Sequence, residues 1–291
     1  MSFVATIGFF DGVHLGHRYV LKQVVAMAGE EHLQSLVVTF CEHPRSVLGG
    51  DDSAGMLLTT ADERLNLIKA EGINQVEMLC FADIRDMTAA KFLLYLKNIL
   101  GVEVLLMGYD HRFGCDCLTQ FADYEAAAER AGIRLVRLHE YEACQTHVSS
   151  TAIRRLLSAG RVEEANHILG YHYMLTGKVV HGRGIGRQLG FPTANIVVDR
   201  CKLVPADGVY AVSVDTADGG RKAVLNIGSN PTVSGSERTL EVHIIGFDGE
   251  LYNKQLTLHL LRYIRAERLF DSTEALRHQI ELDLTCLETS E

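Results

Sequence analysis

Short apolar runs alternate with longer amphipathic stretches over roughly the first half of the chain. The runs are rich in β-branched residues, as are strands buried on both faces of a parallel sheet. They lie at Phe3–Gly8, Gln34–Phe40, Gln75–Phe81, Val102–Met107 and Ile133–Leu138. Helical patterns fill the intervals at about 16–29, 60–72, 88–100 and 118–131. This alternation predicts an α/β, Rossmann-like domain in which a parallel sheet carries helices on both faces.

The pattern changes after two short helical stretches, which run from Ser149 to Gly160 and from Arg161 to Leu169. Beyond Gly170, Asp-Gly pairs that suit tight hairpins separate runs of strand character. The strands are predicted at Tyr173–His181, Val209–Asp215, Arg221–Ile227, Thr239–Phe247 and Lys254–Tyr263. Antiparallel strands without intervening helices predict a small barrel or sandwich, and residues 271–287 predict a C-terminal helix. We therefore predict two domains, residues 1–160 and 161–291.

Composition narrows the function classes. The 291 residues carry a net charge of −9, which argues against a general nucleic-acid binder, although small phosphorylated ligands need only a few local donors. No apolar run reaches the roughly 18 residues of a membrane span. The first residues predict a buried strand rather than a secretory signal, and seven scattered cysteines are typical of reduced thiols. We expect a cytoplasmic protein that binds no membrane, and its oligomeric state stays open.

A glycine-rich motif follows the first predicted strand and reads Gly8-Phe-Phe-Asp-Gly-Val-His14-Leu-Gly-His17. If a helix begins here, the spacing of three residues puts both imidazoles on one helix face. Free N–H groups and a partial positive charge at the helix start favour phosphate, and nucleotides commonly bind at this edge of an α/β sheet. Two imidazoles there can stabilise charge on a triphosphate. The alternative is that one histidine caps the helix and the other is solvated.

A second set of donors lies in Ser149-Ser-Thr-Ala-Ile-Arg154, at the start of another predicted helix. Its hydroxyl groups and backbone amides can bind an anion, and Arg154, one turn further on, can bind phosphate through two nitrogens. Ordinary helix capping by the hydroxyl groups, with a solvated Arg154, is the alternative interpretation.

The barrel region has its own glycine run, Gly182-Arg-Gly-Ile-Gly-Arg-Gln-Leu-Gly190. It is neither a Walker A loop nor a Rossmann fingerprint. Thr193 and Asn195 follow it and offer a hydroxyl and an amide oxygen, which suit Mg²⁺ beside phosphates. Downstream, Glu241 lies on a predicted strand, where a carboxylate can accept a proton from a substrate hydroxyl. A strand glutamate that simply faces solvent is the alternative.

The N-terminal motifs resemble a known family. Residues 7–17, Gly108-Tyr-Asp110-His-Arg112-Phe-Gly114 and residues 149–154 are similar to the HxGH nucleotidyltransferase module of bacterial bifunctional riboflavin kinase/FAD synthetases. In that family the module transfers AMP from ATP to FMN. The resemblance implies that His14 and His17 contact the ATP phosphates and are catalytic. It implies further nucleotide contacts at Gly8, Phe9, Asp11, Gly12, Asp110, Ser150, Thr151 and Arg154, and flavin contacts at Asp110 and Arg112.

The C-terminal motifs resemble the riboflavin kinase module of the same family, a six-stranded antiparallel barrel. The matching segments are 177–184, 190–195, 207–210, 226–232, 241–243 and 265–271. The resemblance implies that Thr193 and Asn195 hold Mg²⁺ and ATP phosphates, with Gly182, Gly184 and Gly186 near the nucleotide. Glu241 becomes the general base on the ribityl 5′-hydroxyl. Arg265 belongs to a flap near the flavin.

These resemblances predict a bifunctional transferase that makes FMN from riboflavin and FAD from FMN, with ATP as co-substrate and Mg²⁺ as cofactor. One alternative is a monofunctional riboflavin kinase with a decayed adenylyltransferase domain, since departures from the family pattern lie near Phe10 and His111. The other alternative is a flavin or nucleotide sensor without catalysis.

Overall fold

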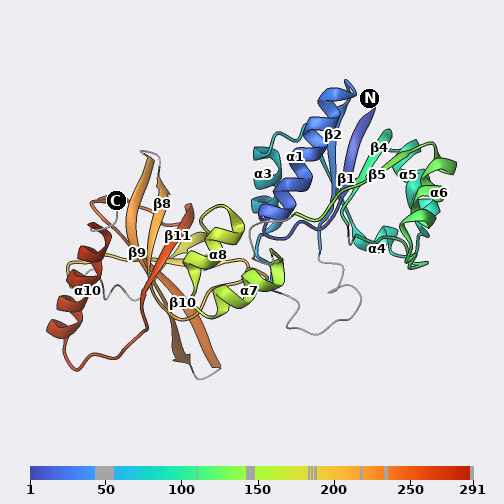
Figure 1. Cartoon of the computed structure of the whole chain (residues 1–291). Coiled ribbons are helices and arrows are strands. Elements are labelled where there is room, and N and C mark those ends of the chain that lie inside the picture. The colour runs from blue at the N-terminus through green and yellow to red at the C-terminus, as the bar shows by residue number, and fades with distance from the viewer. Residues whose placement is uncertain are drawn as a thin grey trace. The chain divides into compact units, whose positions relative to one another are not determined.

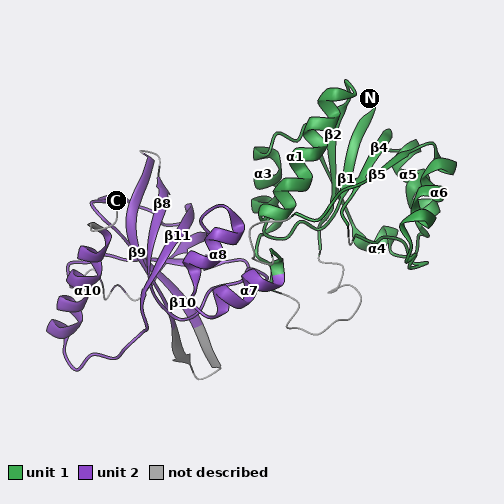
Figure 2. Cartoon of the chain, in the orientation of Figure 1, with its two compact units in different colours: residues 1–150 green, residues 151–291 purple. Residues whose placement is uncertain are grey.

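The chain folds into two compact units, Met1–Ser150 and Thr151–Glu291 (Figure 2). The computed structural model describes residues 1–42, 56–109, 111–141, 148–182, 184, 186, 189–216, 219–232 and 235–288. The first unit is an α/β domain and the second is a barrel with flanking helices (Figure 1). This architecture confirms the predicted fold class. The domain boundary predicted after Gly160 stays a prediction.

The first unit has a five-stranded parallel sheet in the order β3-β2-β1-β4-β5. The strands are β1 (Phe3–Ile7), β2 (Gln34–Phe40), β3 (Gln75–Leu79), β4 (Val102–Met107) and β5 (Arg134–Arg137). The helices are α1 (Leu15–Glu30), α3 (Ala61–Ala70), α4 (Phe81–Ile84), α5 (Ala89–Asn98) and α6 (Phe121–Ala131). Strand order reverses between β1 and β4. In such sheets the crevice at the carboxyl ends of the two central strands is the usual ligand site.

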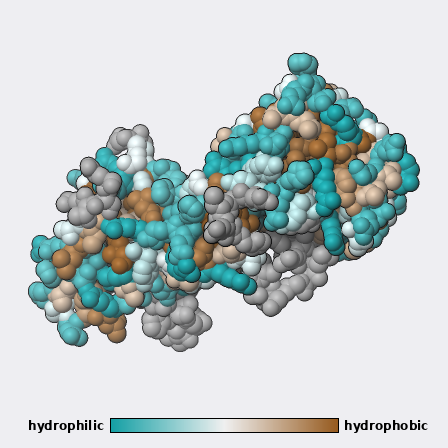
Figure 3. Space-filling model, in the orientation of Figure 1, coloured by the Kyte–Doolittle hydropathy of each residue, from teal (hydrophilic) through white to brown (hydrophobic). Residues whose placement is uncertain are grey.

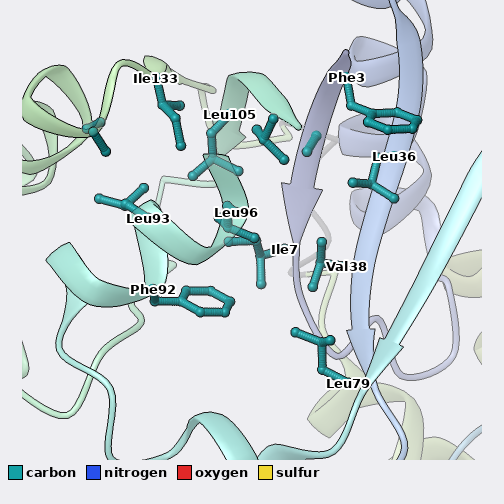
Figure 4. Close-up of a cluster of buried hydrophobic side chains, with 14 of the residues drawn as sticks. Phe3, Ile7, Leu36, Val38, Leu79, Phe92, Leu93, Leu96, Leu105 and Ile133 are labelled. Carbon is teal, nitrogen blue, oxygen red and sulfur yellow. The ribbon is translucent and has the colours of Figure 1, made fainter. Parts of the chain in front are cut away.

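Alternating residues of each strand supply two hydrophobic cores, one on each face of the sheet. Val4 and Val37 pack with Leu21 and Val24 of α1 and Ile68 of α3. On the opposite face, residues of β1, β2 and β4 pack with α5 and α6, as Figure 4 shows for Ile7, Val38, Leu105, Phe92 and Leu96. The three central strands, β1, β2 and β4, are therefore buried on both faces, which explains their largely apolar sequences.

Polar side chains define where the helices begin. Thr60 accepts a hydrogen bond from the Glu63 amide, and Glu63 returns one to the Thr60 amide, so the predicted capping box at the start of α3 is confirmed. Thr88 caps α5 in the same way, through the Lys91 amide. Phe81, which we expected at the end of a strand, instead opens the short helix α4, because β3 ends at Leu79.

The second unit is a closed six-stranded barrel in the order β10-β7-β6-β11-β8-β9. Its strands are β6 (Met174–Val180), β7 (Ala194–Val198), β8 (Gly208–Thr216), β9 (Gly219–Thr232), β10 (Gly235–Ile244) and β11 (Gln255–Arg265). The helices are α7 (Ser150–Ser158), which spans the division between the units, α8 (Val162–Leu169) and α10 (Thr273–Glu288). The hydrophobic pattern does not predict β7, because this strand begins inside the motif at 191–195.

Hydrophilic and hydrophobic residues are interspersed on the face of the molecule that Figure 3 shows. Large hydrophobic side chains that remain exposed include Leu94 and Ile99 near the end of α5 and Leu269 between β11 and α10. No helix in the described part of the chain is long and apolar enough to cross a bilayer.

Candidate active sites

Asp11 organises the loop between β1 and α1. Its carboxylate accepts hydrogen bonds from the Leu58 amide at 3.1 Å, the Thr59 amide at 3.0 Å and the Thr59 hydroxyl at 3.1 Å. The Thr59 hydroxyl also accepts from the Gly12 amide at 3.1 Å. Asp11 is buried, with 3% of its surface exposed. A buried carboxylate with several charge-assisted hydrogen bonds fixes the backbone around it, so this loop is tied to the segment that precedes α3.

The two histidines of the motif lie together at the start of α1. The His14 ring caps the helix, because its Nδ1 accepts a hydrogen bond from the His17 amide at 3.3 Å. The rings stack with their centroids 3.6 Å apart. A Cβ on Gly16 would lie 3.3 Å from the His14 ring, which explains a glycine between the histidines. His14 thus caps the helix, as the alternative expects, but His17 is half-buried with a buried Nδ1 rather than solvated.

Burial changes the chemistry of His17. Desolvation, with a smaller contribution from neighbouring His14, holds the pKa of His17 well below its usual value of 6.5. The ring is therefore neutral at pH 7, and its buried Nδ1 has no hydrogen-bond partner within the described structure. A neutral His14 ring carries its proton on Nε2, because Nδ1 is the acceptor in the cap.

The start of α7 contacts the same loop through one residue. The Ser150 hydroxyl donates to the Asp11 carbonyl oxygen at 2.9 Å. Thr151 is exposed and Arg154 is half-buried on the same helix, and both belong to the second unit. Ser150 and Arg154 are four residues apart and therefore share one helix face.

The loop after β4 is held by a buried tyrosine. The Tyr124 hydroxyl, on α6, accepts from the Phe113 amide at 3.1 Å and donates to the Phe113 carbonyl at 2.9 Å. Arg112 beside Phe113 is exposed. Asp110, predicted at both the nucleotide and the flavin, lies outside the described residues. Buried side chains thus hold both loops at the carboxyl ends of β1 and β4. Asp11 holds the β1–α1 loop, and Tyr124 holds the loop after β4.

The barrel brings together Thr193, Asn195 and Glu241, the three residues predicted to act on phosphate and riboflavin. Glu241 of β10 pairs directly with Asn195 of β7, and the Thr193 hydroxyl donates to Oε2 of Glu241 at 3.4 Å. Asn226 of β9 faces Glu241 from the other side. Glu241 is half-buried, so the alternative of a solvent-facing strand glutamate does not describe it. The hydroxyl, the amide and the carboxylate form one cluster of hard oxygen atoms.

Glycines let the backbone pass close to this cluster. A Cβ on Gly182 would collide with the Asn195 side chain. A Cβ on Gly186 would collide with the Phe191 carbonyl and would lie 3.1 Å from the Thr193 hydroxyl. Gly184 adopts φ +71°, in the left-handed region that glycine favours. Arg183 and Arg187 of the same glycine run lie outside the described residues.

Arg265 lies at the end of β11 and makes an ion pair. Its Nε and Nη2 donate to the Asp283 carboxylate at 2.9 and 2.6 Å, and Gln279 donates to the same carboxylate at 2.8 Å. The Asp283 side chain is 4% exposed. This arrangement ties the beginning of the proposed flap to α10, and a contact between Arg265 and flavin remains a prediction.

Sequence reasoning missed Thr59 and Arg64. Thr59 joins Asp11 and Gly12 across almost fifty residues of sequence, as described above. Arg64 is completely buried, and its guanidinium lies 4.2 Å above the centre of the Phe9 ring. The signal for Arg64 was present, because it occurs four residues before buried Ile68 on the inward face of α3.

Fold and geometry define a two-domain protein: an α/β unit with stacked histidines at its switch point, and an antiparallel barrel with a Thr–Asn–Glu cluster. The FAD synthetase family model matches residues 1–152, and the riboflavin kinase family model matches residues 169–290. The chain therefore belongs to the family of bifunctional riboflavin kinase/FMN adenylyltransferases.

Individual relatives agree with this assignment. A bifunctional riboflavin kinase/FMN adenylyltransferase of Pseudomonas fluorescens is 38% identical over 97% of this chain and 90% of its own length. The Escherichia coli (strain K12) protein of that name is 34% identical over 96% and 90%. A Streptococcus pneumoniae crystal structure, described as a macrolide-efflux protein, superposes with a TM-score of 0.89 at 30% identity over 100% of this chain and 95% of its own.

Proposed function

We propose that each unit of this bifunctional transferase catalyses one of two consecutive reactions. The barrel transfers the γ-phosphate of ATP to riboflavin and forms FMN. The α/β unit transfers AMP from a second ATP to FMN and forms FAD. Family membership over both units supports the pair of activities and not a monofunctional kinase.

In the barrel, Glu241 is the proposed general base. Its carboxylate accepts the proton of the ribityl 5′-hydroxyl, while the hydroxyl oxygen attacks the γ-phosphorus and ADP leaves. The half-buried position and the hydrogen bond from Thr193 orient this carboxylate. The hydrogen bond between Thr193 and Glu241 carries the proposal for this site. It places the residue proposed to bind ATP phosphates beside the proposed general base.

The same cluster has the donor chemistry of a magnesium site. Thr193 supplies a hydroxyl oxygen and Asn195 an amide oxygen, and Glu241 adds a carboxylate beside them. Hard oxygen ligands of this kind fit Mg²⁺, which usually keeps several waters and binds phosphate as well. We propose that Thr193 and Asn195 hold the ion, with Gly182, Gly184 and Gly186 allowing close approach of the nucleotide. When bound, Mg²⁺ neutralises charge on the phosphates.

In the α/β unit, an FMN phosphate oxygen attacks the α-phosphorus of ATP directly and pyrophosphate leaves. No covalent intermediate with the protein is required. His14 donates from Nε2 to a phosphate oxygen, and the α1 amides add further donors. His17 is neutral when desolvated, but phosphate charge beside it raises its pKa and so favours its protonated form. The pair thereby stabilises charge that develops during transfer.

The remaining predicted contacts complete this site. Gly8, Phe9 and Gly12 lie in the loop after β1, and Asp11 holds that loop in place. We propose that Ser150, Thr151 and Arg154 bind the nucleotide and that Arg112 contacts the flavin, with Asp110 beside both. The six cysteines that the structure describes are free thiols, and we propose a cytoplasmic enzyme on that basis.

A time course tests the proposal. The full chain is incubated with riboflavin, ATP and Mg²⁺, and the flavins are separated by chromatography. FMN that appears first and is then converted to FAD is the expected result. FMN as the final product would favour the monofunctional kinase. Stabilisation by FMN or ATP against heat without any product would favour the sensor.

A further inference from the structure

Arg64 is a buried cation beside the adenylyltransferase loop, and no role has been assigned to it above. Its side chain is 0% exposed. One nitrogen, Nη2, donates to the Phe40 carbonyl oxygen at 2.6 Å, at the carboxyl end of β2. The guanidinium plane lies over Phe9, directly beyond the carboxyl end of β1. Arg64 therefore lies at the edge of the sheet where the nucleotide site is expected.

The hydrogen-bonding capacity of Arg64 is only partly used. Two of its nitrogens, Nε and Nη1, are buried without a hydrogen-bond partner in the described structure. An arginine has five N–H donors, and a buried donor without an acceptor destabilises the protein. Proteins rarely keep such a group unless a ligand or another partner satisfies it. Each unpartnered nitrogen shares one edge of the guanidinium with Nη2. Nη2 has two N–H groups and gives one to Phe40, so one edge keeps the pair of N–H groups that bidentate binding of a phosphate requires.

Neighbouring charges compensate this cation incompletely. Asp11 and Cys41 both favour the charged form of Arg64, but burial outweighs them and lowers its pKa. The Asp11 carboxylate accepts its hydrogen bonds from Leu58 and Thr59. Cys41 is a free thiol. An anion with several oxygen atoms would satisfy the guanidinium better than either neighbour does.

We propose that Arg64 is a phosphate-binding residue of the adenylyltransferase site and that Phe9 covers it. Phe9 is only partly buried, so its ring can turn away at a smaller cost than a core side chain. The guanidinium then binds a phosphate oxygen pair, either of FMN or of ATP. This inference rests on the proposed function of the α/β unit, and it adds a cation that no sequence motif indicated.

Two substitutions separate phosphate binding from structural support. Arg64→Lys keeps the positive charge over Phe9 and can keep the bond to Phe40, but it loses the fork of donors. Arg64→Met removes the charge. Arg134→Met is the matched control, because Arg134 is an exposed arginine of the same unit that pairs with Glu31. Initial rates of FAD formation are measured with FMN and ATP varied separately, and riboflavin phosphorylation is measured as a check on the barrel.

We expect Arg64→Lys to raise one KM about tenfold, since a hydrogen-bonded charge pair contributes on that order. A rise in the KM for FMN identifies the flavin phosphate, and a rise for ATP identifies the nucleotide. Thermal unfolding and riboflavin phosphorylation stay at the wild-type level. An unchanged KM for both substrates would overturn the proposal. So would a loss of kcat that only follows a lower unfolding temperature.

A direct measurement separates this inference from the proposed reaction. Inorganic pyrophosphate is added to the full chain, and hydrogen exchange is followed in the peptide that covers residues 56–70. Protection in the wild type and in Arg134→Met, but not in Arg64→Lys, supports phosphate binding even if no FAD forms. Equal protection in all three variants, with normal FAD formation, would reject Arg64 and leave the proposed function standing.

Discussion

The two units assemble their sites by different physical means. In the α/β unit, segments at residues 8–17, 58–64 and 150 meet beyond the ends of parallel strands, and side-chain bonds to backbone groups hold them. In the barrel, Glu241 and Asn195 face each other because β10 and β7 pair in register. The first site therefore depends on a few buried anchors, whereas the second depends on the hydrogen-bond ladder of the barrel.

The difference extends to electrostatics. Arg64 is buried and His17 is half-buried, and desolvation lowers the pKa of each. Glu241 is half-buried, and a hydrogen bond from the Thr193 hydroxyl orients its carboxylate. Desolvated basic groups favour an incoming polyanion, because phosphate charge beside them raises their pKa and stabilises their protonated forms. A half-exposed carboxylate suits proton transfer from a hydroxyl group. Each unit thus has the polarity that its reaction needs.

Substitution of Glu241 tests most sharply whether the sites are independent. Glu241→Gln keeps the shape of the side chain but removes the proton acceptor. We expect FMN formation from riboflavin to fall by about 10²–10⁴-fold, the usual contribution of a general base. FAD formation from supplied FMN should not change, and chromatography of both reactions measures the two rates. Glu250→Gln, exposed in the same unit, is the control. Equal loss of both activities would contradict two separate sites.

The histidine pair provides the reciprocal test. Replacement of both His14 and His17 by alanine removes the imidazoles proposed to contact the phosphates, and the helix cap with them. We expect FAD formation to fall by about 10²–10³-fold, while riboflavin phosphorylation continues and FMN accumulates. His32→Asn is the matched control, since His32 is exposed and its φ of +54° is tolerated by asparagine. Undiminished FAD synthesis would remove the pair from the mechanism.

Local sequence was enough to predict elements whose signals are local. The strands at Gln34–Phe40 and Val102–Met107 were predicted with their observed bounds, because uninterrupted apolar runs end at polar or glycine residues. The histidine helix and the capping box at Thr60 also depend on neighbours in sequence. The pattern does not predict β7, because its first two residues belong to the motif at 191–195, which was interpreted as a ligand-binding loop.

Long-range contacts were beyond such reasoning. Asp11 was expected at the nucleotide, but nothing near it in sequence indicates that Leu58 and Thr59 donate to its carboxylate. The register that joins Glu241 to Asn195 likewise depends on closure of the barrel. The spacing of Arg64 from Ile68 indicates the inward face of the predicted helix, but its complete burial follows from how α3 packs on the sheet. Sequence thus predicts candidate reacting groups, but it does not indicate the residues that hold them in place.

Asp11 is the support whose loss should matter most in the α/β unit. Asp11→Ala leaves the Leu58 and Thr59 amides without their acceptor in a buried place. We expect the free energy of unfolding to fall by about 3 kcal/mol, with slower FAD formation, as charged hydrogen bonds typically contribute 1.5–3 kcal/mol each and not additively. Chemical denaturation of the full chain measures the loss. Asp86→Ala removes an exposed carboxylate of the same unit and should have little effect. Similar losses in both would deny Asp11 its anchoring role.

The smallest expected effect is a pH dependence of stability that His17 gives to the α/β unit. Its pKa in the folded state lies well below 6.5, the value in the unfolded chain. Above pH 6.5 both states are neutral and the stability is at its full value. As pH falls below 6.5 only the unfolded state takes up this proton, so stability falls by at most about 1.4 kcal/mol per pH unit until the folded-state pKa is reached. Calorimetry between pH 8 and 5 should show this fall in the wild type and a flatter profile in His17→Gln, whereas an identical profile in both would mean that His17 is not desolvated in solution.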